Sequence, residues 1–291
     1  MGKILIVADQ EDGCVATSRG LELAQRLGHD VEVVAFAYAP LDRLARDKVQ
    51  KAEMRQKLLD RRTAQVQERI DRFAAEGQKV ALKVVWLKTI YPWIIKRTNA
   101  TNFDLVVKTG ASTGGMTHTS TDWHLLRECP APIFIAAEDK WSRTRPVLAA
   151  VDLDTRKRSK KQLNSKVIRH AKHLADSLGV ELKIISAVVV PTLLADLDIV
   201  DPATYAKERK EEMMPQVKAL AAEHGLPQKA FVLKRGPVDK VIHSQAAKVR
   251  AQVVVMGTVA RRGIKAQLVG NTAESVLQDM RTDVLALKPD S

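Results

Sequence analysis

A glycine-rich and arginine-rich stretch in the second half of the chain has the residue types of an anion site. Residues 257–275 are GTVARRGIKAQLVGNTAES, and they follow the apolar run AQVVVM. Glycine lets successive backbone N–H groups point at an anion, and the N-terminus of a following helix adds a favourable dipole. Arg261, Arg262 and Lys265 could donate charge-assisted hydrogen bonds to phosphate. The stretch indicates a phosphate cradle, with a plain strand-to-helix connection as the alternative.

Asp152 is the second candidate for a polar role. It follows the apolar run PVLAAV and is itself followed by the basic segment RKRSKK, residues 156–161. Basic side chains there could bind the same anion as the glycine-rich stretch. The alternative is that these lysines and arginines are solvated surface.

A third group of residues has the types of zinc ligands. His118, Asp122, His124 and Cys129 lie within the segment THTSTDWHLLREC. A tetrahedral site needs such side chains to converge from compatible spacings. The alternative is that Asp122 caps a helix N-terminus while the others pack around it.

The elements that must position these residues form two similar series. KILIVAD and PVLAAVD are both apolar runs that end in aspartate, and IYPWIIKRTNATNFDLVVK aligns without a gap on VDKVIHSQAAKVRAQVVVM. Ile94 then matches Ile242, Leu105 matches Val253, and Ile133 matches Val284. Ordered matches with a slowly drifting offset indicate a duplicated domain. We expect domains at 1–142 and 143–291, with the boundary in the polar segment AEDKWSRTR.

Each copy has the pattern of a strand, a helix, a strand, a long helix, and then three further strands separated by two helices. In the second copy an apolar stripe that starts at Leu163 stops at Gly179, and the strand VELKIISAVVV follows. Strands rich in Val, Ile and Leu that alternate with helices require a parallel sheet covered on both faces. We therefore predict two tandem, doubly wound α/β domains with parallel five-stranded sheets. Asp152 and the Gly257 stretch should lie at the same edge, where such sheets bind ligands.

Composition narrows the classes of function. The chain has 291 residues, a formal net charge of +13 and 4% aromatic residues. The charge favours anionic ligands, but so few aromatic rings argue against a stacking platform for single strands, and we expect no specific nucleic acid recognition. No apolar run approaches the length of a membrane span and no signal peptide is present, so we expect a cytoplasmic protein. Cys14 and Cys129 are expected to be reduced thiols.

The glycine spacing resembles the universal stress protein family. Its nucleotide-binding members have Gly-x2-Gly-x9-Gly-(Ser/Thr) after the fourth strand, and here Gly257, Ala260, Gly270 and Asn271 occupy those places. Ala260 replaces the second glycine, and Asn271 replaces the hydroxyl residue. With the duplication and the ending LVGNTAESVLQDMRTDVLALKPD, the chain is similar to the tandem E-type members over nearly its whole length.

The resemblance implies a nucleotide site in the second domain. Asp152 would bind the nucleoside, and Met256 and Gly257 would lie against the base and ribose. The phosphates would be held by the remaining residues of the loop and helix start, namely Val259, Ala260, Arg261, Gly270, Asn271 and Thr272. In the first copy Lys108, Thr109 and Gly110 replace Met-Gly-Thr, so we expect its nucleotide site to be lost.

The function expected from this resemblance is that of a stress-response binding or signalling protein. It would bind an adenine nucleotide of the ATP type, with Mg²⁺ as a possible companion ion, and its two domains would pair as a pseudo-dimer. No catalytic motif and no Walker lysine is visible, which favours binding over hydrolysis. A slow ATPase is the enzymatic alternative. A third alternative is that the altered pocket binds a nucleotide-sugar or another anionic amphiphile.

Overall fold

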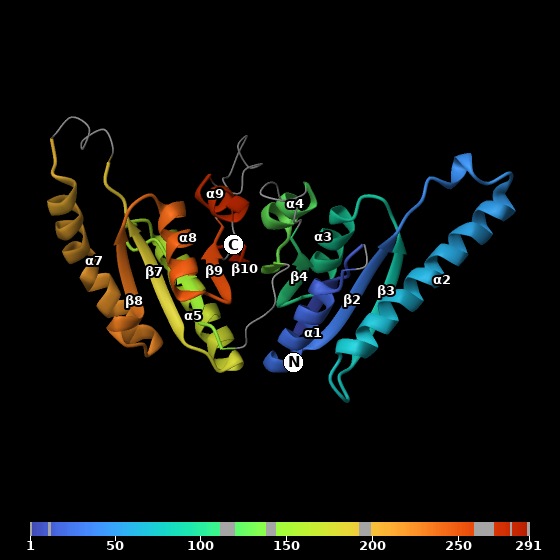
Figure 1. Cartoon of the computed structure of the whole chain (residues 1–291), viewed down its shortest axis with the longest axis horizontal. Helices are drawn as coiled ribbons and strands as arrows, with labels where there is room; N and C mark the ends of the chain where they lie inside the picture. The colour runs from blue at the N-terminus through green and yellow to red at the C-terminus, as the bar shows by residue number, and fades with distance from the viewer. Residues whose placement is uncertain are drawn as a thin grey trace. The chain divides into compact units, whose positions relative to one another are not determined.

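The computed structural model describes residues 2–10, 13–110, 120–137, 144–191, 199–258, 271–279 and 281–289. These residues divide into two compact units, which we call unit 1, within residues 2–137, and unit 2, within residues 144–289. Figure 1 shows the strands and helices of both units, and its colour runs from blue at the N-terminus to red at the C-terminus. The predicted pairing of the two units as a pseudo-dimer stays a prediction.

Unit 1 alternates strands and helices along a parallel sheet. Its described strands pair in the order β3-β2-β1-β4-β5, and every pairing between them is parallel. A short 3-10 turn, Leu41–Arg43, precedes the long second helix. The elements are β1 (Lys3–Val7), α1 (Val15–Leu27), β2 (Asp30–Ala37), α2 (Lys48–Phe73), β3 (Val80–Trp86), α3 (Tyr91–Ala100), β4 (Leu105–Thr109), α4 (Ser120–Glu128) and β5 (Ile133–Ala136).

Unit 2 repeats the same series. Its described strands pair in parallel in the order β10-β9-β6-β7-β8, which is the order of unit 1 read from the opposite end. The elements are β6 (Val147–Ala150), α5 (Arg158–Leu178), β7 (Leu182–Val188), α7 (Pro202–His224), β8 (Phe231–Arg235), α8 (Val238–Val249), β9 (Val253–Gly257), α9 (Asn271–Asp279) and β10 (Asp283–Leu287), with a 3-10 turn at Gln228–Ala230.

The predicted duplication and fold class are confirmed. Ile94 in α3 and Ile242 in α8 are both buried, and Leu105 and Val253 each begin the fourth strand of their unit. Right-handed crossovers put the helices before and after the reversal of strand order on opposite faces. Consistently, α1 contacts α2, α3 contacts α4, α5 contacts α7, and α8 contacts α9.

α5 follows the predicted pattern of an amphipathic helix. Leu163, Val167, Ala171 and Leu174 are all buried against the strands of unit 2. The helix ends at Gly179, whose φ of 67° is in the left-handed region that glycine adopts without strain. The apolar positions and the glycine at the helix end depend only on residues that are close in the sequence, so the sequence was enough to predict them.

Two further expectations concern membrane spans and cysteines. Within the described ranges, no helix is both long and apolar enough to cross a bilayer. Neither Cys14 nor Cys129 forms a disulfide within the described residues, and their reduced state stays a prediction.

Candidate functional site

The strand order places the candidate site at the point where the winding of unit 2 reverses. The chain turns from β6 to β7 on one side and reaches β9 on the other, and doubly wound sheets bind ligands at such a point beyond the carboxyl ends of their strands. β6 and β9 are paired, with Ala150 opposite Met256. Asp152 follows the first strand and Gly257 ends the second, so the predicted placement of both residues at one edge is confirmed.

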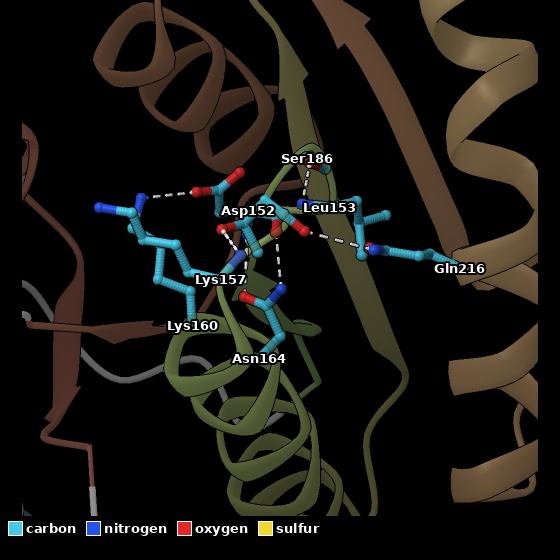
Figure 2. Close-up of polar contacts among 8 residues, drawn as sticks. Asp152, Leu153, Lys157, Lys160, Asn164, Ser186 and Gln216 are labelled. Atoms are coloured by element: carbon cyan, nitrogen blue, oxygen red, sulfur yellow. Dashed lines mark hydrogen bonds and ion pairs between the residues drawn. The ribbon is translucent and has the colours of Figure 1, made fainter.

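The turn after β6 is held by polar side chains that sequence reasoning missed. The Asn164 side chain accepts a hydrogen bond from the Asp152 N–H at 3.0 Å and donates one to the Asp152 carbonyl at 2.7 Å. The Ser186 hydroxyl accepts a bond from the Leu153 N–H at 3.2 Å. Figure 2 shows these contacts around the turn. Asn164 is only 6% exposed, so the backbone beside Asp152 has a fixed conformation.

The carboxylate of Asp152 remains accessible at this turn. Its side chain is 46% exposed, and its Oδ2 lies 2.9 Å from Lys160 Nζ at the start of α5. Asp154, a second acid that the sequence analysis passed over, pairs with Arg209 of α7. Each acid of this turn therefore has a cationic partner. Lys160 belongs to the basic segment 156–161, whose predicted proximity to Asp152 is confirmed for this residue.

Gly257 has a packing role that the sequence analysis did not predict. A Cβ at this position would lie 2.5 Å from Leu163 Cδ2, so the absence of a side chain lets α5 approach the end of β9. Gly257 is not among the described glycines with positive φ. Met256 is 4% exposed and belongs to the core. Contact of either residue with a base or ribose stays a prediction.

The remaining predicted residues lie on the connection from β9 to α9. Asn271 and Thr272 begin α9, as expected. Val259, Ala260, Arg261, Arg262, Lys265 and Gly270 lie outside the described residues. Thr258 is buried, and its N–H and hydroxyl both donate to the Leu287 carbonyl, at 2.7 and 3.2 Å. The start of the connection is thereby anchored to the end of β10.

The equivalent edge of unit 1 is occupied by its own side chains. Asp9 Oδ2 and Thr109 Oγ1 both accept from the N–H of Ala16 at the start of α1, at 3.2 and 2.9 Å. Arg62 and Arg69 of α2 both donate to the Asp9 carbonyl. Burial of Arg62 and the nearby Arg69 charge lower the pKa of the Arg62 guanidinium. Asp9 is therefore engaged by the backbone of its own unit, whereas Asp152 pairs with a side chain near the surface.

The proposed zinc ligands have separate partners. Asp122 is fully buried and pairs with Lys108 at 2.7 Å, while His124 stacks on Tyr91 and contacts Glu128. Cys129 Sγ lies 3.5 Å from the Thr98 hydroxyl, and His118 lies outside the described residues. The residues that the structure describes contain no group of three such ligands. Asp122 is also the third residue of α4, so the expectation that it caps this helix is wrong.

The described residues at the carboxyl edge of β6 and β9 do not fit a Mg²⁺ ion that is held by protein side chains. Mg²⁺ needs carboxylate oxygens that are available for octahedral coordination. Asp152 and Asp154 instead pair with Lys160 and Arg209. A Mg²⁺ ion at this edge would depend on oxygens that a ligand brings with it.

Comparisons with known proteins agree with this architecture. Residues 144–288 match the model of the universal stress protein family. The chain is 30% identical over 297 residues to universal stress protein E of Salmonella typhi, which covers 99% of this chain and 94% of the relative. It is equally identical to the protein of that name from Escherichia coli K12, over 99% of this chain and 93% of the relative.

A solved structure gives the same result. A crystal structure from Pseudomonas aeruginosa UCBPP-PA14, described as a universal stress protein, superposes with a TM-score of 0.73 and 26% identity. The match covers 99% of this chain and 93% of the other. Sequence identity and fold therefore agree over both units, and the chain belongs to the universal stress protein family, as a tandem member of its E type.

Proposed function

We propose that this protein is a stress-response binding or signalling protein that binds an adenine nucleotide of the ATP type in unit 2. The proposed site is the carboxyl edge of β6 and β9, where Asp152 would accept hydrogen bonds from the nucleoside. The segment from Val259 to Thr272 would hold the phosphates through its backbone and Arg261. The proposal rests above all on the accessible Asp152 carboxylate on a turn fixed by Asn164 at the winding reversal.

The ion pairs of the turn after β6 favour a protein that binds the nucleotide over one that hydrolyses it. Phosphoryl transfer needs acids that hold Mg²⁺ and a group that orients the attacking water. The described acids of this turn, Asp152 and Asp154, pair with Lys160 and Arg209, which makes them poor candidates for either role. A slow ATPase remains the enzymatic alternative. Binding of a nucleotide-sugar or another anionic amphiphile is the alternative for a pocket altered at Ala260 and Asn271.

A titration of the full chain with a fluorescent ATP analogue tests the proposal. Asp152→Asn keeps the size of the side chain but replaces the charged carboxylate, which would accept hydrogen bonds from the nucleoside, by a neutral amide. We expect affinity to fall by about 1.5–3 kcal/mol, roughly 10- to 150-fold. Asp9→Asn is the matched control, because Asp9 follows the first strand of unit 1 and its amide oxygen can still accept from Ala16. We expect this control to change affinity by less than about twofold.

Hydrolysis is measured on the same two proteins. A single-turnover rate near 1 per second or faster, about the lower end of ordinary enzymes, would contradict the binding role. An equal loss of affinity in Asp9→Asn and Asp152→Asn would contradict the assignment to unit 2. Mass spectrometry of ligands retained through native purification separates an adenine nucleotide from a nucleotide-sugar.

A further inference from the structure

A hollow of about 550 Å³ lies beside α5 in unit 2, and it is lined by residues other than those of the proposed nucleotide site. Its wall includes one face of α5, the end of α7 and Pro289 beyond β10. The charged and hydroxyl-bearing residues that matter here are Arg158, Lys161, Ser165, Lys166, Arg169 and Glu223. Pockets of roughly 300–1,000 Å³ hold small organic ligands, so the volume exceeds what one phosphate ion needs.

The charge of this hollow is strongly positive. Four of its lining residues are cations of α5, namely Arg158, Lys161, Lys166 and Arg169. Glu223 is the acidic residue of the lining, so the formal charge is four minus one, or +3. Lys166 Nζ also donates to the Lys288 carbonyl at 2.9 Å, which fixes the chain after β10 against the helix.

The start of α5 is basic. Its first turn contains no acidic residue, and Lys157 at the N-cap makes no capping hydrogen bond through its side chain. Two other helices, α2 and α7, have an aspartate at the N-cap, and the carboxylates of Asp47 and Asp201 accept from Gln50 and Thr204 N–H groups at 2.8 and 2.7 Å. A helix dipole disfavours cations at this end and favours anions. A bound anion would offset the repulsion between the basic side chains at the start of α5 and the positive end of the helix dipole.

Two polar residues of the lining, Ser165 and Glu223, contact His224, which is not itself part of the lining. The Ser165 hydroxyl contacts the Glu223 carboxylate and lies 3.1 Å from His224 Nε2. The His224 side chain is 9% exposed. Its pKa is lowered, first by burial and further by the Arg169 and Lys172 charges, while Glu223 acts in the opposite direction. The imidazole is therefore close enough to the hollow to respond to an anion bound there.

We propose that this hollow is a binding site for a small molecule with several phosphate groups. Arginine guanidinium groups bind phosphate through paired N–H donors, and lysines add point charges. A single phosphate group would fill only a small part of the hollow and would not balance the formal charge of its lining. This site does not depend on the proposed nucleotide site, because none of its lining residues is among the residues assigned there.

Calorimetric titration of the full chain with inorganic tripolyphosphate at near-physiological salt tests the proposal. We expect saturable binding that the double variant Arg158→Gln/Arg169→Gln weakens at least about tenfold, since it removes two charge-assisted partners. Lys57→Gln/Arg61→Gln is the matched control, because it removes two exposed cations from α2 of unit 1. We expect this control to change the affinity by less than about twofold.

Nuclear magnetic resonance of the histidine side chains locates the bound ligand. A nearby anion favours the protonated imidazole, so tripolyphosphate should raise the pKa of His224. The resonance is assigned by its loss in His224→Gln, and its shift should disappear in Arg158→Gln/Arg169→Gln.

Three results would overturn the proposal. The first is equal weakening by the two double variants, which would mean attraction by overall charge. The second is binding that leaves the His224 resonance unchanged, which would place the ligand elsewhere. The third is tighter binding of a duplex DNA through Arg158 and Arg169, which would make the hollow part of a nucleic acid surface.

Discussion

Asp152 and Asp9 occupy the same position after the first strand of their units, yet their surroundings differ. The Asp9 carboxylate accepts from the N–H of Ala16, and two arginines of α2 donate to its carbonyl. Asp152 has a half-exposed carboxylate and a turn fixed by Asn164. An acid already bonded to its own backbone is a weaker ligand for a nucleoside. This difference is the residue-level reason for assigning the nucleotide to unit 2.

Glu32 gives a prediction about stability at the same scale. Its buried carboxylate pairs with Arg97 at 2.6 Å and with Lys3 at 2.8 Å. The hydrogen bonds from Arg97, and then the contact with Lys3, outweigh burial and lower the pKa of Glu32 from 4.5 to about 2. Because the folded pKa is the lower one, this stabilisation is complete above about pH 4.5. It is lost as the pH falls toward 2.

We expect Glu32→Gln to lower the free energy of unfolding of unit 1 by about 2 kcal/mol at pH 7. Each pKa unit corresponds to about 1.4 kcal/mol, and screening of the partly exposed Lys3 and Arg97 reduces the total. Urea denaturation between pH 7 and pH 2 should show the difference shrinking below pH 4.5. Glu181→Gln is the control, since the pair of Glu181 with Lys183 is exposed. A difference independent of pH would contradict this electrostatic origin.

At the scale of elements, α5 connects the core of unit 2 to its candidate sites. Leu163 packs under Gly257 and Asn164 fixes the Asp152 turn. Lys160 pairs with Asp152, while the cations on another face of the helix line the hollow. A shift of this one helix would therefore disturb both proposed sites.

We expect Gly257→Ala to destabilise unit 2 by about 1–3 kcal/mol, the usual cost of overpacking. The added methyl group would lie 2.5 Å from Leu163 Cδ2, so the helix or the leucine would have to move. Shortening the leucine should relieve this clash. A double-mutant cycle with Leu163→Ala, measured by urea denaturation, tests this. The double variant should be destabilised by at least about 1 kcal/mol less than the sum of the two single variants. Additive costs would show that the glycine is needed for another reason.

At the scale of the whole molecule, the duplication gives two units with the same strand order but different side chains at the carboxyl edge of the sheet. Asp152 lies just beyond β6 and Gly257 ends β9, whereas Thr109 at the end of β4 and Asp9 beyond β1 both accept from the N–H of Ala16. If unit 2 alone binds the nucleotide, ligand should stabilise one half of the chain. Hydrogen exchange can measure the two halves separately in the intact protein.

We expect an ATP analogue at about 100 times its Kd to stabilise unit 2 by about 2.7 kcal/mol. Amide exchange should slow in β6 and β9, with the amides of β1 and β4 as the internal control. Gly270→Val should abolish this protection without unfolding the chain, because a side chain there would block close approach of the backbone to phosphate. Protection of β1 and β4 instead would contradict the assignment.

The sequence by itself determined the elements, their duplication and the edge of the candidate site. The stripe of α5 and its end at Gly179 depend on residues three or four positions apart, which a sequence displays directly. The placement of Asp152 and Gly257 at one edge followed from the rule that parallel strands end at the same edge.

Only the tertiary structure decided which partner each polar side chain has. Asp122 pairs with Lys108, Asn164 bonds to the turn of Asp152, and Gly257 makes room for Leu163. The basic segment at residues 156–161 is also divided by the helix, because Lys160 faces Asp152 while Arg158 and Lys161 line the hollow. These contacts depend on the helical rotation of α5 and on the packing of separate elements against one another. A few degrees of rotation change them without changing the hydrophobic pattern of the sequence.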